Sequence, residues 1–455
     1  MLRTRWKKAV FVGAGGIGMS ALARHFVREG IDVLGTDVAA NDQTAALRAA
    51  GVPVAIGHSA ANLPLDADVL VHTEAAGPET PEIAAARRRG VLVLGYAEAL
   101  GALCQGRESV AVAGCHGKTT TTAMTAHILK EAGRDPGAVI GGVVPQFGGN
   151  FLLGRGDPLV VEGCEFRRSF QKIGAKHAII TNVGADHLDY YRDLDEIRAA
   201  FRDFAQALPA HGWLVLPLAT ADELQLGPGL KCHLVRIGRE ADFAAAVDGP
   251  RSFRVSFRGV GPWPRMRLAI PGPHNVANAV LAAVLAHTAF GVAPEEIGPA
   301  LATFRGVGRR FEILADTRET AVVDDYAHHP DEILAVVGAA RERFPGRRIV
   351  AVFQPHLDSR TRALFAPFVE ALSSADLVLC VADYRVAGRD ERPTEGARRL
   401  AEAINKKAAI DAVDAGANAA AVDCALFHKQ PGDVLLVMGA GDVREVGIEL
   451  ARRVS

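Results

Sequence analysis

The chain has 455 residues, which is long enough for two to four domains with sizeable hydrophobic cores. Hydrophobic residues at 49% and charged residues at 23% are ordinary for a globular enzyme. A net charge of −1 provides no general attraction to nucleic acid or to an anionic membrane, and 6% aromatic residues argue against base-stacking platforms. We therefore expect neither nucleic acid nor membrane as a partner.

The six cysteines are scattered and form no C-x-x-C pair, which predicts a reduced protein without a structural zinc site. The apolar run at residues 9–12 is far too short for a signal peptide, and no long apolar stretch follows it. These features favour a cytoplasmic location.

The first unit begins with a predicted strand at 8–12, the turn Gly13-Ala14-Gly15-Gly16-Ile17-Gly18 and a helix that runs through Arg28. A second strand follows at 31–35 and leads to Asp37. This is the G-x-G-x-x-G fingerprint of dinucleotide sites, with an acid about twenty residues further on. The turn itself requires only a pyrophosphate at a helix N-terminus. A UDP-sugar therefore fits it as well as NAD does.

Two more strands are predicted at 69–71 and 91–94, and the unit ends near Gly106. Helical segments separate the strands. The pattern indicates a small, open, parallel sheet.

The second unit opens with a β-branched run at 110–113, then Gly114-Cys115-His116-Gly117-Lys118-Thr119-Thr120 and a predicted helix. Strand, glycine-rich loop and Gly-Lys-Thr form the context of a nucleoside-triphosphate site. The glycines allow backbone N–H groups to face phosphate oxygens, Lys118 supplies a charge for the outer phosphates, and the Thr119 hydroxyl suits Mg²⁺. The loop is shorter than the standard P-loop, because its first glycine would fall at position 111, which is Ala.

Further strands of this unit are predicted at 158–162 and 178–183, and each is followed by acidic residues or histidine. Ligands of α/β sheets bind at the carboxyl ends of the strands. A helix is predicted at 195–208, a β-rich portion at 213–270, and an Ala-rich helix from 272 to 289.

The third unit again alternates strands and helices, with strands at 321–325, 348–353, 376–380 and 433–438. An Ala-rich segment at 408–421 predicts a helix. No short repeat or low-complexity linker is visible.

In their order and spacing, these motifs resemble the Mur ligases over essentially the whole length. The marks are Val12–Ser20, Ala113–Thr122, Asp186-His187-Leu188-Asp189, His274–Asn278, Gly308–Glu312, Asp324–Pro330, Phe353–His356 and Ser359–Arg362. The resemblance implies three α/β domains: a Rossmann-like UDP-sugar domain at 1–106, a P-loop ATPase domain with a parallel sheet at 107–314, and a Rossmann-like ligase domain at 315–455.

The activity that this resemblance implies is an ATP-dependent ligation in peptidoglycan precursor synthesis. ATP and Mg²⁺ would activate the carboxylate of UDP-N-acetylmuramate as an acyl phosphate, and the amine of L-alanine would displace the phosphate. The double histidine after Asp-Tyr points to this activity or to that of a close relative, the ligase that reattaches a recovered tripeptide, which is the alternative. A monomer or a homodimer is expected.

Site residues follow from matching motifs in the resemblance. Residues implied to bind ATP are Gly114, Cys115, His116, Gly117, Lys118, Thr119, Thr120, Asn278, Arg310 and Asp325. Residues implied to hold metal are Thr119, Glu162 and His187, with Glu162 favoured over Glu165 because it ends the strand. Residues implied around the UDP-sugar are Gly15, Gly16, Ile17, Gly18 and Asp37. In the chemical step, Lys118 and His187 would act with Arg360, which suits a carboxylate, and His329, which would orient the amine.

Some residues depart from the family pattern. Cys115 stands where relatives usually carry Thr, and Gly163-Cys164 stands where relatives carry Ala-Asp before Glu165. The segment His72-Thr73-Glu74-Ala75-Ala76 stands where relatives usually have a small-residue turn beside the sugar nucleotide. Two other hypotheses are kept: a nicotinamide-dependent oxidoreductase, which leaves the Lys118 loop unexplained, and a catalytically idle nucleotide-binding regulator.

Overall fold

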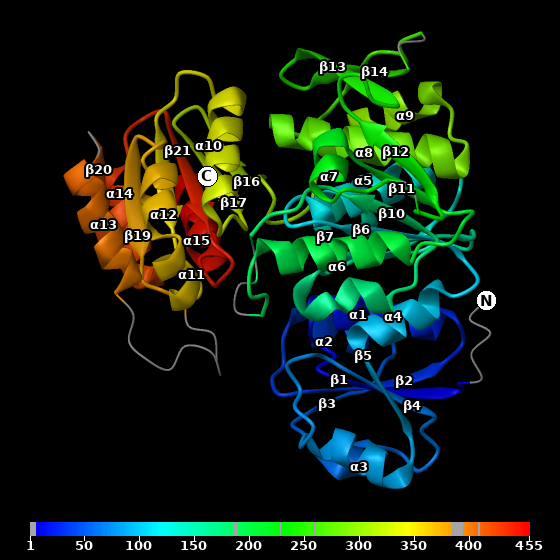
Figure 1. Cartoon of the computed structure of the whole chain (residues 1–455). Helices are drawn as coiled ribbons and strands as arrows, with labels where there is room; N and C mark the ends of the chain where they lie inside the picture. The colour runs from blue at the N-terminus through cyan, green and yellow to red at the C-terminus, as the bar shows by residue number, and fades with distance from the viewer. Residues whose placement is uncertain are drawn as a thin grey trace. The chain divides into compact units, whose positions relative to one another are not determined.

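The computed structural model describes residues 6–185, 187, 190–227, 229–258, 261–384, 395–407 and 410–455. Asp186, Leu188 and Asp189 of the motif around His187 lie outside the described residues. The chain divides into two compact units, the first made of 1–247, 253–267 and 277–304, the second of 248–252, 268–276 and 305–455. The first unit contains two domains, so the fold has three α/β domains, each built on its own sheet (Figure 1).

The N-terminal domain is a five-stranded parallel sheet in the order β3-β2-β1-β4-β5. Its strands are β1 (Lys8–Val12), β2 (Asp32–Asp37), β3 (Val54–Ile56), β4 (Val69–His72) and β5 (Leu92–Gly95). Its helices are α1 (Ile17–Arg28), α2 (Asp42–Ala49), η1 (Ala60–Asn62), α3 (Pro81–Arg89) and α4 (Tyr96–Cys104). The chain winds outward in both directions from β1 and β4, so the carboxyl ends of these two strands form the switch point where such sheets bind ligands.

The central domain is a ten-stranded mixed sheet in the order β15-β14-β13-β12-β11-β10-β6-β9-β7-β8. Its strands are β6 (Glu108–Ala113), β7 (Gly137–Val144), β8 (Gly149–Leu153), β9 (Pro158–Glu162), β10 (His177–Ile180), β11 (Trp213–Pro217), β12 (His233–Ile237), β13 (Phe243–Gly249), β14 (Ser252–Phe257) and β15 (Met266–Arg267). Its helices are α5 (Lys118–Glu131), η2 (Pro145–Phe147), η3 (Phe166–Lys172), α6 (Leu194–Gln206), α7 (Leu218–Glu223), α8 (Pro273–Phe290) and α9 (Pro294–Thr303).

The strand β6 lies between β10 and β9 and is parallel to both. Residues 109–113 of this strand are buried, as expected for an interior strand of a parallel sheet covered on both faces. The helix α5 then packs on β6, β9 and β7. The loop between β6 and α5 therefore sits at the carboxyl edge of the sheet, where its backbone is held from both sides.

The C-terminal domain is a six-stranded sheet in the order β16-β17-β21-β18-β19-β20, parallel except for the β16–β17 pair. Its strands are β16 (Glu312–Asp316), β17 (Thr320–Asp325), β18 (Ile349–Phe353), β19 (Leu377–Val381), β20 (Asp411–Gly416) and β21 (Asp433–Met438). Its helices are α10 (Pro330–Arg343), α11 (Asp358–Ala363), α12 (Phe365–Leu372), α13 (Gly396–Lys407), α14 (Asn418–His428) and α15 (Arg444–Val454).

The prediction of one helix over 408–421 is wrong. Residues 411–416 form the edge strand β20, which pairs with β19 from Leu377 opposite Asp411, and α14 begins only at Asn418. Pairing with β19 outweighs the helix propensity of the alanines, and Gly416, with φ of 70°, turns the chain into the helix. Ala408 lies outside the described residues.

Within the first unit, the helix α1 contacts the hairpin β7–β8 of the central sheet. The His25 imidazole Nε2 lies 2.9 Å from the Ala138 carbonyl oxygen. Arg28 donates to the carbonyls of Leu153 and Gly154. The helix that follows the first glycine turn is thus fixed to the neighbouring sheet. In the described part of the chain, no helix is long and apolar enough to cross a bilayer.

Candidate active site

The loop between β6 and α5 has no room for side chains at its two glycines. Gly114 has φ of 135°, and a Cβ there would lie 2.0 Å from Thr181 Oγ1. Gly117 has φ of 79°, and a Cβ there would lie 2.5 Å from Asn278 Oδ1. The predicted nucleotide contact Asn278 therefore lies directly against the loop. The first N–H groups of α5 have no acceptor within the helix and form a natural anion site.

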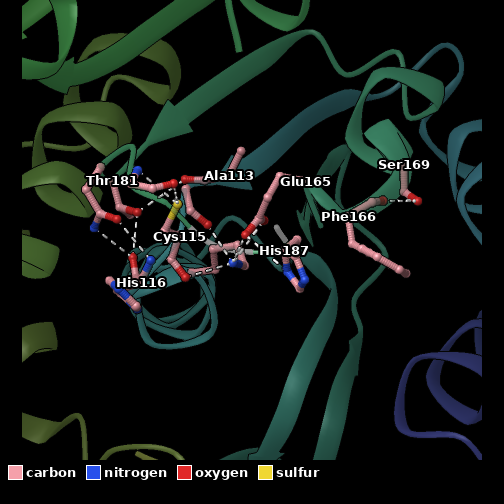
Figure 2. Close-up of polar contacts among 12 residues, drawn as sticks. Ala113, Cys115, His116, Glu165, Phe166, Ser169, Thr181 and His187 are labelled. Atoms are coloured by element: carbon pink, nitrogen blue, oxygen red, sulfur yellow. Dashed lines mark hydrogen bonds and ion pairs between the residues drawn. The ribbon is translucent and has the colours of Figure 1, made fainter. Parts of the chain in front are cut away.

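The segment that follows β10 holds the loop in shape (Figure 2). Asn182 accepts a hydrogen bond from the His116 N–H at 2.9 Å, and the Thr181 hydroxyl donates to the His116 carbonyl at 2.6 Å. The Cys115 thiol donates to the Gly184 carbonyl at 3.2 Å and accepts its N–H at 3.1 Å. The Cys115 thiol therefore both donates and accepts a hydrogen bond, and both join the loop to Gly184.

Lys118 points back across its own loop. Its Nζ donates to the Gly114 and Cys115 carbonyls at 2.5 and 3.0 Å and pairs with Glu165 at 3.0 Å. Burial lowers the pKa of Lys118, but the surrounding negative groups, with Glu165 the strongest of them, together outweigh burial and keep that pKa above its ordinary value. The ammonium group is therefore fully charged at neutral pH, as a phosphate ligand must be.

Glu165, not Glu162, makes the ion pair with Lys118. Glu165 is 1% exposed, and its backbone carbonyl accepts the Tyr191 hydroxyl at 2.5 Å. The Glu162 carboxylate instead accepts the Gly141 N–H at 2.9 Å, in the neighbouring strand β7. Both carboxylates nevertheless act on the charge of Lys118, so both lie at the same edge of the sheet.

His187 lies beside Glu165 (Figure 2). Its Nε2 is 3.7 Å from Glu165 Oε1, and its ring centroid is 4.9 Å from that of Phe166. The backbone of His187 has φ of 54°, an uncommon conformation for a residue other than glycine. Lys118, Glu165 and His187 thus come from three separate segments and meet beside one loop.

The first glycine turn is built differently. Asp37 is buried, and its two carboxylate oxygens accept the N–H groups of Gly15 at 2.7 Å and Ala39 at 3.3 Å. A Cβ on Gly18 would lie 2.8 Å from the Tyr96 ring, and one on Gly13 would lie 2.4 Å from Thr73 Cγ2. Asp37 therefore shapes the turn through hydrogen bonds to the backbone.

Gly16 and Ile17 complete this turn at the start of α1. Gly16 is the N-cap residue of α1, and its N–H bonds to the Gly13 carbonyl at 3.1 Å. The Ile17 carbonyl accepts the Asn150 side-chain amide at 2.5 Å. The N-terminus of α1, where a pyrophosphate is predicted, is thus held by β8 as well as by its own domain.

In the C-terminal domain, Asp325 is buried and bonds to backbone. Its oxygens accept the N–H groups of Phe311 at 2.7 Å and Ala327 at 2.8 Å. Burial raises the pKa of Asp325 to about 6, against the opposing effects of Arg310 and of the two N–H donors. Asp325 therefore fixes the turn at 309–311, in which Arg309 and Phe311 have positive φ.

The two arginines of this turn differ. Arg309 donates to the carbonyls of Gly439 and Gly441 at 2.8 and 3.0 Å, so its guanidinium is committed to the fold. Arg310 lies over the Tyr326 ring at 5.3 Å and is 3.9 Å from Glu332. Arg310, the predicted nucleotide contact, is thus the more weakly held of the pair.

Aromatic rings gather near the predicted amine-binding residues. His356 stacks on Tyr384 at 5.4 Å, and His328 lies 6.1 Å from His356 and 5.5 Å from Tyr326. Burial lowers the pKa of His328, with Glu332 acting in the opposite direction and Arg360 in the same direction. Arg360, on α11, is therefore near this ring cluster.

His329 is the N-cap of α10 and accepts the Asp331 N–H at 3.4 Å. Sequence reasoning had overlooked Glu165 as the partner of Lys118, and it had not singled out His356 or Tyr384. The only available signal was the position of Gln354-Pro355-His356 directly after a strand.

Three family descriptions match the chain: "Mur ligase family, catalytic domain" at 8–108, "Mur ligase middle domain" at 112–286 and "Mur ligase, glutamate ligase domain" at 309–441. The chain is similar to the UDP-N-acetylmuramate–L-alanine ligase of Anaeromyxobacter dehalogenans, with 39% identity over 99% of this chain and 98% of that protein. It is 39% identical to the same-named enzyme of Geobacter sulfurreducens, over 97% and 96% of the two chains.

Solved structures agree. The crystal structure of UDP-N-acetylmuramate-alanine ligase from Thermotoga maritima matches with a TM-score of 0.82 and 30% identity, over 98% of this chain and 99% of that one. A murein peptide ligase from Psychrobacter arcticus matches with a TM-score of 0.73 and 25% identity, over 98% of each chain. Members of the family whose domains match here use ATP. The chain belongs to the Mur ligase family.

Proposed function

We propose that this chain joins L-alanine to UDP-N-acetylmuramate in peptidoglycan precursor synthesis, at the expense of ATP. The observation that carries the proposal is the 39% identity to UDP-N-acetylmuramate–L-alanine ligases along nearly the whole chain. The loop at Gly114–Thr120, with a charged lysine beside a helix N-terminus, supports the phosphoryl-transfer step.

In that step, an oxygen of the sugar-borne carboxylate attacks the γ-phosphorus of ATP, and ADP leaves. The amine of L-alanine then attacks the acyl carbon, the C–O bond to phosphate breaks, and the amine loses a proton. Both partners of the first step are anions, so the protein must supply positive charge and N–H donors. Lys118 and the first turn of α5 supply both.

The loop accepts a triphosphate because of its backbone. Gly114 and Gly117 both have positive φ, and such turns let successive backbone N–H groups point toward one anion. Cys115 and His116 hold this shape through hydrogen bonds to β10 and its following loop, whereas Thr119 and Thr120 lie on the first turn of α5.

The oxygen donors beside the loop fit Mg²⁺, which prefers hard ligands and retains several waters. The candidates are the Thr119 hydroxyl and the Glu162 carboxylate, with His187 nearby as in the sequence-based prediction. Among the residues that the structure describes, the buried Glu165 Oε2 meets no donor besides Lys118, its ion-pair partner, and it is a fourth candidate ligand. A bound Mg²⁺ would neutralise charge that develops on the transferred phosphoryl group.

The N-terminal turn is proposed to hold the uridine diphosphate. Gly15, Gly16, Ile17 and Gly18 line the start of α1, where backbone N–H groups meet a pyrophosphate. Asp37 accepts a hydrogen bond from the Gly15 N–H and so holds the turn in place. In dinucleotide sites, by contrast, the corresponding acid binds a ribose hydroxyl directly. This use of Asp37 is a reason to favour the UDP-sugar over NAD.

For the C-terminal domain, we propose that Arg360 pairs with the carboxylate of the amino acid and that His329 orients its amine. Arg310 contacts the nucleotide in this proposal. Asp325 contributes by holding the backbone of the turn at 309–311, which carries Arg310. The proximity of Arg360 to the rings of His328, His356 and Tyr384 supports a pocket for a small zwitterion.

The direct test supplies the purified chain with ATP, Mg²⁺, UDP-N-acetylmuramate and one amino acid at a time, and measures phosphate release. We expect release that depends on L-alanine and is lost in Lys118→Ala. Release with a tripeptide, but not with alanine, would favour the activity named for the murein peptide ligase instead. No release with either would refute the proposal.

A further inference from the structure

The turn between Glu165 and Ser169 contains two consecutive residues in the left-handed region. Arg167 has φ of 52° and ψ of 28°, and Arg168 has φ of 56° and ψ of 27°. This conformation is uncommon and unfavourable for residues with a Cβ, and it persists only where the surroundings enforce it. Because this turn lies beside the candidate active site, we ask which side chains its unusual backbone positions.

The turn is firmly anchored on the central domain. The Arg168 N–H and the Tyr191 hydroxyl both donate to the Glu165 carbonyl, at 2.9 and 2.5 Å. The Arg168 side chain reaches Glu196 at 3.3 Å and Asp203 at 3.4 Å, on α6. Glu165 and Arg168 thus anchor the turn to the central domain. The Arg167 side chain takes no part in these anchoring contacts.

The Arg167 side chain leaves the central domain and meets the N-terminal one. Its guanidinium is 3.6 Å from the Glu74 carboxylate and lies 5.3 Å from the Phe166 ring centroid. The two charged side chains are 52% and 43% exposed. An ion pair this exposed contributes little to stability, so it does not account for a strained backbone.

Glu74 stands at the switch point of the N-terminal sheet. It follows β4 by two residues, and its neighbour Thr73 packs against Gly13 of the glycine turn. The buried acid Asp37 borders the same turn. The helix α1 carries its basic residues, Arg24, His25 and Arg28, far from its first turn. The first turn of α1 therefore offers a diphosphate N–H groups but no cationic side chain, and a cation would have to come from another segment.

We propose that Arg167 supplies that cation: it binds the diphosphate of the sugar nucleotide and gives up Glu74 as its partner when it does so. This inference rests on the proposed binding of a UDP-sugar at the N-terminal turn. The ligand class is a nucleoside diphosphate, and guanidinium is well suited to such oxyanions. Because Glu165, two residues earlier, contacts Lys118, the same turn would connect the diphosphate to the phosphoryl-transfer site.

The test is calorimetric titration of UDP into the intact chain and into variants. We expect Arg167→Gln to weaken UDP binding about 10-fold to 100-fold, the usual range for a charge-assisted hydrogen bond. Arg88→Gln, which removes a similar charge from the exposed face of α3, is the matched control and should bind as wild type does.

Arg167→Gly separates binding from folding. Glycine adopts the left-handed conformation without strain, so this variant should melt at or above the wild-type temperature and still bind UDP as weakly as Arg167→Gln. Wild-type affinity for UDP in Arg167→Gly and Arg167→Gln would overturn the proposal, whatever their stability.

The exchange of partners is tested with Glu74→Gln. Freeing Arg167 should tighten UDP binding several-fold in the wild-type background and have no effect in Arg167→Gln. An equal gain in both backgrounds would mean that Glu74 merely repels the ligand, and the exchange would be refuted.

Three ligands locate the contact. Equal losses for UDP, UDP-N-acetylglucosamine and UDP-N-acetylmuramate in Arg167→Gln support the diphosphate, whereas a loss confined to the last would move Arg167 to the sugar-borne carboxylate and overturn the assignment. Failure of wild type to bind any of the three would refute the proposed function itself. Normal wild-type binding with unaffected variants would refute only the role of Arg167.

Discussion

Two glycine turns in this chain share one backbone arrangement but have side chains of opposite charge beside them. The turn at Gly13–Gly18 and the loop at Gly114–Thr120 each join a buried parallel strand to a helix. The second carries its own cation, Lys118, held against Glu165. The first has the acid Asp37 bonded to its backbone and no cation in the first turn of its helix. A glycine motif therefore specifies the shape of the backbone. The charged side chains around it then determine which phosphate-containing ligand can bind there.

Lys118→Ala tests the central loop and should have the largest effect. Loss of the ammonium group removes the cation that we propose lies beside the transferred phosphoryl group, and it takes from the buried Glu165 carboxylate its ion pair with Lys118. We expect kcat to fall at least about 10²–10³-fold. Lys130→Ala, an exposed lysine of the same helix, is the control and should retain activity in the phosphate-release assay.

His25→Gln tests how the helix of the first turn is attached. Burial lowers the pKa of His25 to about 4, against a weaker raising effect of the Ala138 carbonyl. Between pH 6.5 and 4 the unfolded chain binds this proton and the folded chain does not, so the stabilisation present above pH 6.5 is lost as pH falls.

The loss in wild type should approach about 3 kcal/mol over that interval, since one pKa unit corresponds to about 1.4 kcal/mol. Gln can still donate to Ala138 but cannot titrate, so the pH dependence of the urea-unfolding midpoint should be shallower in His25→Gln. Parallel curves for the two proteins would refute this account of α1.

Two glycine substitutions, one in each turn, should change stability by less and allow the two turns to be compared directly. Gly114→Ala places a Cβ 2.0 Å from Thr181, with φ of 135°, whereas Gly16→Ala meets its nearest atom at 3.4 Å and needs no left-handed backbone. We expect Gly114→Ala to cost about 1–3 kcal/mol of stability and Gly16→Ala much less. Thermal melting of both variants checks the difference, and equal costs would contradict the geometry described above.

Most of the fold was predictable because the strands are short apolar runs and the glycine turns have fixed spacing. Lys118, Gly117 and Asp37 were predicted from their places in these motifs, and in the structure each lies at its glycine turn. The edge strand at 411–416 was missed, since its alanines favour a helix locally and only pairing with β19 overrides them.

The partners of the site residues were harder to foresee. Glu165 reaches Lys118 because of two left-handed arginines, which no propensity rule predicts. Asp325 was expected to contact nucleotide, and its bonds to the backbone depend on how the turn at 309–311 folds. The contact of His356 with Tyr384 joins segments that are brought together only by the sheet.

The most direct test of the central claim follows an oxygen atom. UDP-N-acetylmuramate labelled with ¹⁸O in both carboxylate oxygens is incubated with the chain, ATP, Mg²⁺ and L-alanine, and the released phosphate is examined by mass spectrometry. Activation by phosphoryl transfer predicts one ¹⁸O in each phosphate and one in the new amide. Phosphate without label would contradict the account.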